Sequence, residues 1–159
     1  MSEVVLRPVR DEDLDLFFGH YQDPVASRMA AFVASDPSDR SDFDARWERI
    51  RSNPEITVRT VEVGGRVAGH IASFVMEGRL DVTYWIDRDL WGQGIASAAL
   101  RQLLDVVPER PIHGRAASDN LGSLRVLEKC GFRRIGDERG FANARGEEID
   151  EVVYRRDDA

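Results

Sequence analysis

Between residues 82 and 107 the hydrophobic pattern changes from that of a strand to that of a helix, and the change spans two closely spaced glycines. Residues 82–86 are aromatic and β-branched, which predicts a strand. From Ile95 onward the apolar residues recur with a period near 3.6, which predicts an amphipathic helix. Gly92 and Gly94 stand between the two, and glycine permits positive φ and close approach of a ligand. Because N–H groups at a helix start bind phosphate without a basic side chain, we expect a phosphate site here.

This loop resembles motif A of the GNAT superfamily of N-acetyltransferases, usually written Gln/Arg-x-x-Gly-x-Gly/Ala. The corresponding residues here are Trp91, Gly92, Gln93, Gly94, Ile95 and Ala96. The last two fixed positions of the motif match. Trp91 departs from the first, and Trp-Gly at this place is frequent in the Rim-type branch, which resembles ribosomal-protein N-terminal acetyltransferases. The resemblance implies that this loop binds acetyl-CoA, mainly through backbone N–H groups of residues 93–96.

A second motif follows at the spacing usual for the same family. Residues 120–132 read Asn-Leu-Gly-Ser-Leu-Arg-Val-Leu-Glu-Lys-Cys-Gly-Phe, similar to the family's Asn-x-x-Ser-x-x-Val-Leu-Glu-Lys-x-Gly-Phe. The resemblance implies that Asn120 hydrogen-bonds the pantetheine region, although an asparagine there also suits a helix cap. It implies that Ser123 lies near the cofactor sulfur and donates to the departing thiolate; packing against the sheet is the simpler alternative. Many members have a tyrosine at the position of Leu127, so the commonest general acid is absent.

The order of the expected elements agrees with the same family. Strands are expected at residues 4–9, 56–63, 66–75, 80–86, 111–117, 132–135 and 148–155, and helices begin near residues 11, 41, 95 and 120. Gly64-Gly65 predicts a hairpin, and residues 25–40 are expected to form a loop. The order β-α-α-β-β-β-α-β-α-β-β is that of the GNAT fold. It implies an α/β (α+β) fold, with a mixed, mostly antiparallel sheet of about seven strands and about four helices, in a single acetyltransferase domain over residues 1–159.

In this family the strand before the phosphate loop separates from the strand after the central helix. The amide-rich pantetheine arm then pairs with the exposed edge as an added strand would. The resemblance places that edge at Tyr84, Trp85 and Ile86, and a β-bulge there would help to expose it.

The proton acceptor is the least constrained of the expected site residues. Asp81 stands at a position that is often acidic in the family. A partly desolvated carboxylate could take the proton of the amine, directly or through water. Glu77 and His70, on neighbouring strands, are competitors, and a solvated surface charge is the plain alternative for each.

Composition restricts the other functions that the chain could have. The formal net charge of −7 argues against a nucleic-acid-binding surface and is compatible with a cationic amine substrate. Cys130 is the only cysteine, so an internal disulfide is excluded, and we expect it to pack in the core. The three histidines, at positions 20, 70 and 113, are too scattered to indicate a metal site, and no apolar run reaches the length of a membrane span.

These observations together predict a cytoplasmic N-acetyltransferase. It would move an acetyl group from acetyl-CoA directly to a primary amine, either a protein N-terminus or a small molecule. We expect a monomer or homodimer that contacts neither nucleic acid nor membrane. The alternative is a GNAT fold that binds or senses acyl-CoA without turnover.

Overall fold

The computed structural model describes residues 3–158, and its seven strands form one sheet in the order β1-β2-β3-β4-β5-β7-β6. The strands are β1 (Val4–Arg7), β2 (Thr57–Val63), β3 (Arg66–Met76), β4 (Arg79–Ile86), β5 (Ile112–Ala117), β6 (Arg133–Ala142) and β7 (Glu147–Arg156). The α-helices are α1 (Asp11–Tyr21), α2 (Pro24–Ala30), α3 (Arg40–Ser52), α4 (Ile95–Val106) and α5 (Leu121–Lys129). Only β4 and β5 pair in parallel; the other neighbours are antiparallel. The predicted fold class is therefore confirmed.

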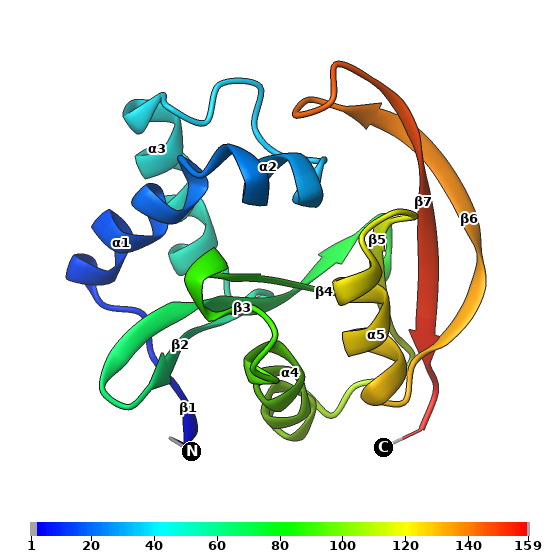
Figure 1. Ribbon diagram of the computed structural model, residues 1–159. Coiled ribbons are helices and arrows are strands. Elements are labelled where there is room, and N and C mark those ends of the chain that lie inside the picture. Colours follow the sequence, from blue (N-terminus) through cyan, green and yellow to red (C-terminus); the bar gives the residue numbers. More distant parts are fainter. Residues whose placement is uncertain (1–2, 159) are drawn as a thin grey trace.

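Helices cover both faces of the sheet, with α4 and α5 on one side and α1, α2 and α3 on the other (Figure 1). The apolar face of α4 is buried, as the 3.6-residue period predicts, through Ile95, Ala99, Leu100, Leu103 and Leu104. These side chains pack with Val82 and Ile86 of β4 in the largest core cluster. Because residues alternate along a strand, the intervening β4 residues face the side of α1–α3. The two faces of β4 therefore belong to different compartments.

The structure has one helix more than the sequence predicts. Helix α2 occupies part of the segment that we expected to be a loop, and it is capped by Asp23 with Pro24 at its first position. Several bounds also differ. Helices α3 and α5 begin at Arg40 and Leu121, each one residue from the expected starts at 41 and 120, and Asn120 is the N-cap of α5. Strand β6 continues to Ala142, seven residues beyond the expected end at residue 135, because it pairs with β7 along its whole length.

Strands β4 and β5 separate shortly after they meet. Their pairing is restricted to Asp81 with His113 and Val82 with Gly114. Beyond this point no strand within residues 3–158 pairs with the β5-side edge of β4 at residues 83–86, as the family resemblance implies. No bulge contributes to this exposure, because the β3–β4 register is continuous from Gly69 opposite Ile86 to the hairpin. The edge is exposed by the divergence of β5.

Candidate functional site

The loop between β4 and α4 has the backbone shape that anion binding requires. Gly92 and Gly94 both have a φ of +78°, and a Cβ at either position would enter open space. The first hydrogen bond within α4 runs from Ala98 N to Gly94 O. The earlier N–H groups of the first turn therefore remain for an external acceptor, and the helix dipole adds positive potential there. A phosphate group fits this cradle.

Trp91 holds the loop against the end of β4. Its indole Nε1 donates to Ile86 O at 2.8 Å, while the ring remains 42% exposed. The family usually has a flexible polar side chain at this position, whereas Trp91 forms a fixed intramolecular contact. Gln93 is exposed between the two glycines.

On the side of α4 and α5, the strand edge lies close to the start of α5. The Tyr84 hydroxyl donates to Ser123 O at 3.4 Å, and burial raises the pKa of Tyr84 to about 12. Asn120 caps α5 by accepting from Ser123 N at 3.3 Å, and its Nδ2 donates to Met29 O at 3.4 Å. The capping role considered for Asn120 is therefore present, and the same side chain connects α5 to α2. Tyr84, Asn120 and Ser123 lie together beside the opening.

The three candidate proton acceptors occupy very different surroundings. Asp81 is 1% exposed, and neither carboxylate oxygen has a hydrogen-bond partner within residues 3–158. Burial raises the pKa of Asp81, and Arg79 is the main group that opposes the shift. His70 is buried, with Nε2 2.7 Å from the Tyr21 hydroxyl, and burial lowers its pKa to about 3. Glu77 is exposed in the β3–β4 turn, at the end of β4 opposite the phosphate loop. Of the three, Asp81 lies nearest the point where β4 and β5 separate.

A cavity of about 230 Å³ lies on the other face of β4. It reaches β4 at residues 83–85, immediately after the last residue paired with β5. Its aromatic walls are Tyr21, Phe32, Phe43, Trp47, Tyr84 and Trp85. The Tyr21 and Trp85 rings are 4.8 Å apart between centroids, in an edge-to-face arrangement. The cavity is therefore an apolar, aromatic space that ends at the opening in the sheet.

Charged side chains are concentrated where the α2–α3 loop and α3 border this cavity. Asp36, Asp39 and Asp42 line it together with a single cation, Arg46. Arg46 Nη2 donates to Asp42 Oδ2 at 2.9 Å, so its charge is already paired. Hydrogen bonds from the Ser38 hydroxyl and backbone N–H lower the pKa of Asp36 and keep it ionised. This border therefore carries a net negative charge.

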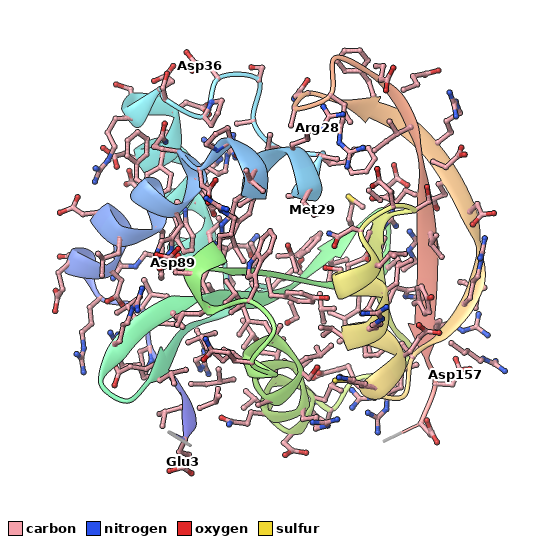
Figure 2. All side chains as sticks on the ribbon, in the orientation of Figure 1. Glu3, Arg28, Met29, Asp36, Asp89 and Asp157 are labelled. Atoms are coloured by element: carbon pink, nitrogen blue, oxygen red, sulfur yellow. The ribbon has the colours of Figure 1, made fainter. Side chains whose placement is uncertain are left out.

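The β6–β7 loop closes over the end of α2. Asn143 Nδ2 donates to Val33 O at 2.7 Å, and Ala144 N donates to Ala31 O at 3.1 Å. Arg145 forms a bidentate pair with Asp119, with distances of 2.7 and 2.9 Å. Figure 2 shows Arg28 and Met29 at the end of α2 that faces this hairpin, and Asp36 on the loop that follows. The β6–β7 loop and the end of α2, which come from opposite halves of the chain, are therefore joined above the opening in the sheet.

The sequence did not indicate the cavity. Tyr21, Phe43 and Trp47 fit the apolar faces of their helices, and nothing local in the sequence shows that these faces leave a space above β4. The aromatic residues are numerous on both helices, and that abundance was the only available signal. Within residues 3–158, no group of three or more His, Cys, Asp or Glu side chains could hold a metal ion, and none of the helices has the length and apolar character needed to cross a membrane.

The arrangement defines an acyltransferase. A phosphate cradle and an unpaired strand edge on one side can hold a long, amide-containing thioester, and a separate cavity reaches the same opening from the other side. An acceptor in that cavity would meet the thioester in the gap between β4 and β5. No covalent enzyme intermediate is required by this geometry.

Comparison with known proteins identifies the family. The model described as "Acetyltransferase (GNAT) domain" matches residues 3–133. A relative from Bacillus licheniformis named "Uncharacterized N-acetyltransferase p20" is 25% identical over 163 residues, which cover 96% of this chain and 92% of that protein. The structure of the microcin C7 self immunity acetyltransferase MccE, in complex with acetyl-CoA and AMP, has a TM-score of 0.81 at 16% identity and covers 98% of this chain and 92% of its own. The structure of RimJ from Mycobacterium smegmatis, in complex with CoA-disulfide, has a TM-score of 0.79 at 22% identity. The match covers 97% of this chain and 81% of RimJ.

The chain therefore belongs to the GNAT acetyltransferase family. It is an N-acetyltransferase, and its acetyl donor is acetyl-CoA, as predicted. The likeness to MccE and RimJ shows that the fold is shared.

Proposed function

We propose that this acetyltransferase acts on small primary amines that carry a flat or apolar group, and that the amine binds in the aromatic cavity. The observation that carries the proposal is the position of the cavity, which ends at residues 83–85 of β4, where β4 and β5 part. An amine held there would project toward the thioester without crossing the sheet. Stacking and edge-to-face contacts with Tyr21 and Trp85 would favour an aromatic or alkyl substituent.

Charge and size support the same acceptor class. The acidic border attracts an ammonium ion from solution, because Asp36 and Asp39 have no partner cation of their own in the cavity wall. A volume of about 230 Å³ suits a small molecule or one residue of a peptide. The bonds from Asn143 and Ala144 to the segment after α2 hinder access by a folded protein surface.

Two further assignments are part of the proposal. We assign the chain to the Rim-type branch on the Trp91-Gly92 pair and Ser123. We place the reaction in the cytoplasm, because a free cysteine such as Cys130 stays reduced there. Residues 1–159 act as one catalytic unit. Residues between 21 and 85 line the cavity, and the phosphate loop and α5 come from the part of the chain that follows.

The residue roles follow from their positions. Backbone N–H groups of residues 93–96 hold the pyrophosphate, and the edge at residues 84–86 pairs with the pantetheine arm. Asn120 contributes its remaining amide hydrogen to that arm. Ser123 donates to the departing thiolate, and a carboxylate beside the opening, either Asp81 or a neighbour of Asp81, receives the amine proton.

The test is a panel of acceptors with acetyl-CoA, followed by release of free thiol and by mass spectrometry of the product. The panel contains aryl-alkyl amines such as phenethylamine, linear aliphatic amines, and tetrapeptides with free N-termini. We expect kcat/KM for the best aryl-alkyl amine to exceed that of every tetrapeptide at least tenfold. Turnover of tetrapeptides alone would refute the acceptor class, and acetyl-CoA binding without any turnover would favour the non-catalytic alternative.

A further inference from the structure

A compact group of charged side chains lies on the acceptor side of the sheet, next to the opening. It comprises Arg79 and Asp81 from β4, His113 and Arg115 from β5, Glu138 from β6 and Glu151 from β7. Arg115 is at its centre, with Nε 3.6 Å from Asp81 Oδ1, Nη1 2.8 Å from Glu138 Oε2 and Nη1 3.7 Å from Glu151 Oε1. Three carboxylates therefore share two arginines.

The members of this group are not equally satisfied. Asp81 is almost fully buried, and both of its oxygens lack a hydrogen bond, as do Nε and Nη2 of Arg115, within the described part of the chain. Buried polar groups are normally paired, so such atoms require an explanation. Glu138 takes the shortest bond from Arg115 and is half exposed. Glu151 is left with the longest contact and a side chain only 13% exposed.

Glu151 is also the member best placed for the reaction. It pairs in register with Ala117, the last residue of β5, in the stretch where β5 has already left β4. Its carboxylate lies 3.7 Å from Nη1 of Arg115, the residue that follows the last β5 position paired with β4. Asp81, by contrast, is one of the two β4 residues that still pair with β5, and its carboxylate lies between Arg79 and Arg115.

We propose that Glu151 accepts the proton of the attacking amine, directly or through one water, and that Asp81 is a positioning residue that competes with Glu151 for the charges of Arg79 and Arg115. The proposal rests on the proposed function, because it takes the amine to enter from the cavity side. In the reaction the amine nitrogen forms a bond to the acetyl carbonyl carbon and gives its proton to the Glu151 carboxylate. The carbon–sulfur bond breaks, and the thiolate leaves toward Ser123 and solvent.

The surroundings of Glu151 adjust its affinity for a proton to this task. Burial, and then the negative charges of Glu138 and Asp81, raise the pKa of Glu151 to about 7, while Arg79 opposes the shift. A proton acceptor works best when its pKa is near the operating pH. Removing the charge of Asp81 would withdraw one repulsion and release Arg79 and Arg115 toward Glu151. Both effects lower the pKa of Glu151.

The experiment compares the wild type with Glu151→Gln, Glu151→Asp, Asp81→Asn and a control, Glu148→Gln. Glu148 is an exposed carboxylate on the same strand. kcat is measured from pH 6 to 9.5 with whichever amine the enzyme accepts. We expect Glu151→Gln to lower kcat about 100-fold at pH 7.5 with unchanged acetyl-CoA affinity. It should also remove the fall in kcat below about pH 7, which is the acid limb of the pH profile. Glu151→Asp should restore part of the rate, Asp81→Asn should move the acid limb to lower pH, and Glu148→Gln should have no effect.

A second readout does not depend on the acceptor. Carbon-13 NMR of enzyme labelled at its glutamate carboxyls, assigned against Glu151→Gln, should show Glu151 titrating near pH 7 and at lower pH in Asp81→Asn. A midpoint below pH 5 in the wild type would overturn the proposal, and so would an unchanged acid limb in Glu151→Gln. If only amines outside the expected class are acetylated, the cavity assignment fails while Glu151 is still tested.

Discussion

Leu127 on α5 lies directly against the backbone of Gly114 on β5. A Cβ at Gly114 would lie 2.6 Å from Leu127 Cδ2 and 3.4 Å from Val82 Cγ2. Gly114 and Val82 are the last residues at which β5 and β4 pair, so this contact fixes α5 at the point where the opening begins. Leu127 is 1% exposed and fills the position that holds a tyrosine in many family members. The hydroxyl that would serve the thiolate must therefore come from elsewhere.

The Gly114–Leu127 contact predicts a stability effect. We expect Gly114→Ala to lower the free energy of unfolding by about 1–3 kcal/mol, because the new methyl group forces Leu127 out of its position. Chemical denaturation measures the change. Gly136→Ala on β6 is the control, since a Cβ there meets nothing within 4 Å. Equal denaturation midpoints for Gly114→Ala and Gly136→Ala would contradict the tight contact.

The phosphate cradle predicts a loss of cofactor affinity. We expect Gly94→Val to lose most of the affinity for acetyl-CoA, because a branched side chain at a φ of +78° strains the loop and adds bulk where the phosphate approaches its N–H groups. Gly78→Val is a matched control: Gly78 has a φ of +75°, also with open space, but lies in the β3–β4 turn. Both variants carry similar backbone strain, so calorimetry with acetyl-CoA should separate them. If the two bind equally well, the cradle is assigned to the wrong loop.

Ser123 predicts a kinetic effect without a binding effect. If its hydroxyl assists the thiolate, Ser123→Ala should lower kcat about 10- to 100-fold while the Kd for acetyl-CoA is unchanged. The backbone N–H of residue 123, which donates to Asn120, is retained in this variant, so the helix cap should persist. Steady-state kinetics and calorimetry give the two quantities. A kcat equal to that of the wild type would leave Ser123 with a packing role only.

The surroundings of Asp13 predict how the free energy of unfolding falls at acid pH. Burial acts to raise the pKa of Asp13, but hydrogen bonds from Arg7, from Arg10 N and from Thr60 outweigh it and lower the pKa to about 2. A carboxylate whose pKa is depressed in the folded state stabilises the fold above its unfolded pKa of 3.8. That contribution should disappear as the pH falls from about 4 to about 2.

Asp13→Asn should remove this part of the pH dependence and cost about 3 kcal/mol at pH 7, because it removes the more buried of the two carboxylates that pair with Arg7. Thermal denaturation between pH 2 and pH 7 measures both effects. Asp11→Asn is the control, since Asp11 forms an exposed pair with Arg51 and should change stability by less than about 0.5 kcal/mol. The same pH dependence in Asp13→Asn and the wild type would refute the assignment.

The sequence predicted those features that local residue chemistry determines. Gly92 and Gly94 have the positive φ that the loop was expected to need, and the amphipathic period placed α4. Helix α2 was missed because seven residues give too little periodicity, although Asp23 followed by Pro24 is a typical helix start. The extension of β6 was missed because its exposed, charged residues resemble a loop until the pairing with β7 is known.

The acceptor cavity and the charged group could not be predicted, because both depend on contacts between distant segments. Tyr21 meets Trp85 only once α1 lies on the sheet, and Glu151 approaches Arg115 only once β7 has paired with β5. A carboxylate on an exposed-looking strand gives no sign in sequence that it will be buried beside two others. Asp81 was identified by family position alone.

The central claim is that the amine binds in the aromatic cavity, and the kinetics of Ala72→Leu test it most directly. Ala72 lies on β3, is 6% exposed and lines the cavity, so a leucine there would fill space that the amine needs. Ala45 is exposed on α3, and Ala45→Leu is the matched control. We predict that Ala72→Leu raises KM for the best small amine at least tenfold, that neither variant changes the Kd for acetyl-CoA, and that Ala45→Leu leaves KM unchanged. An unchanged KM in folded Ala72→Leu would contradict the account.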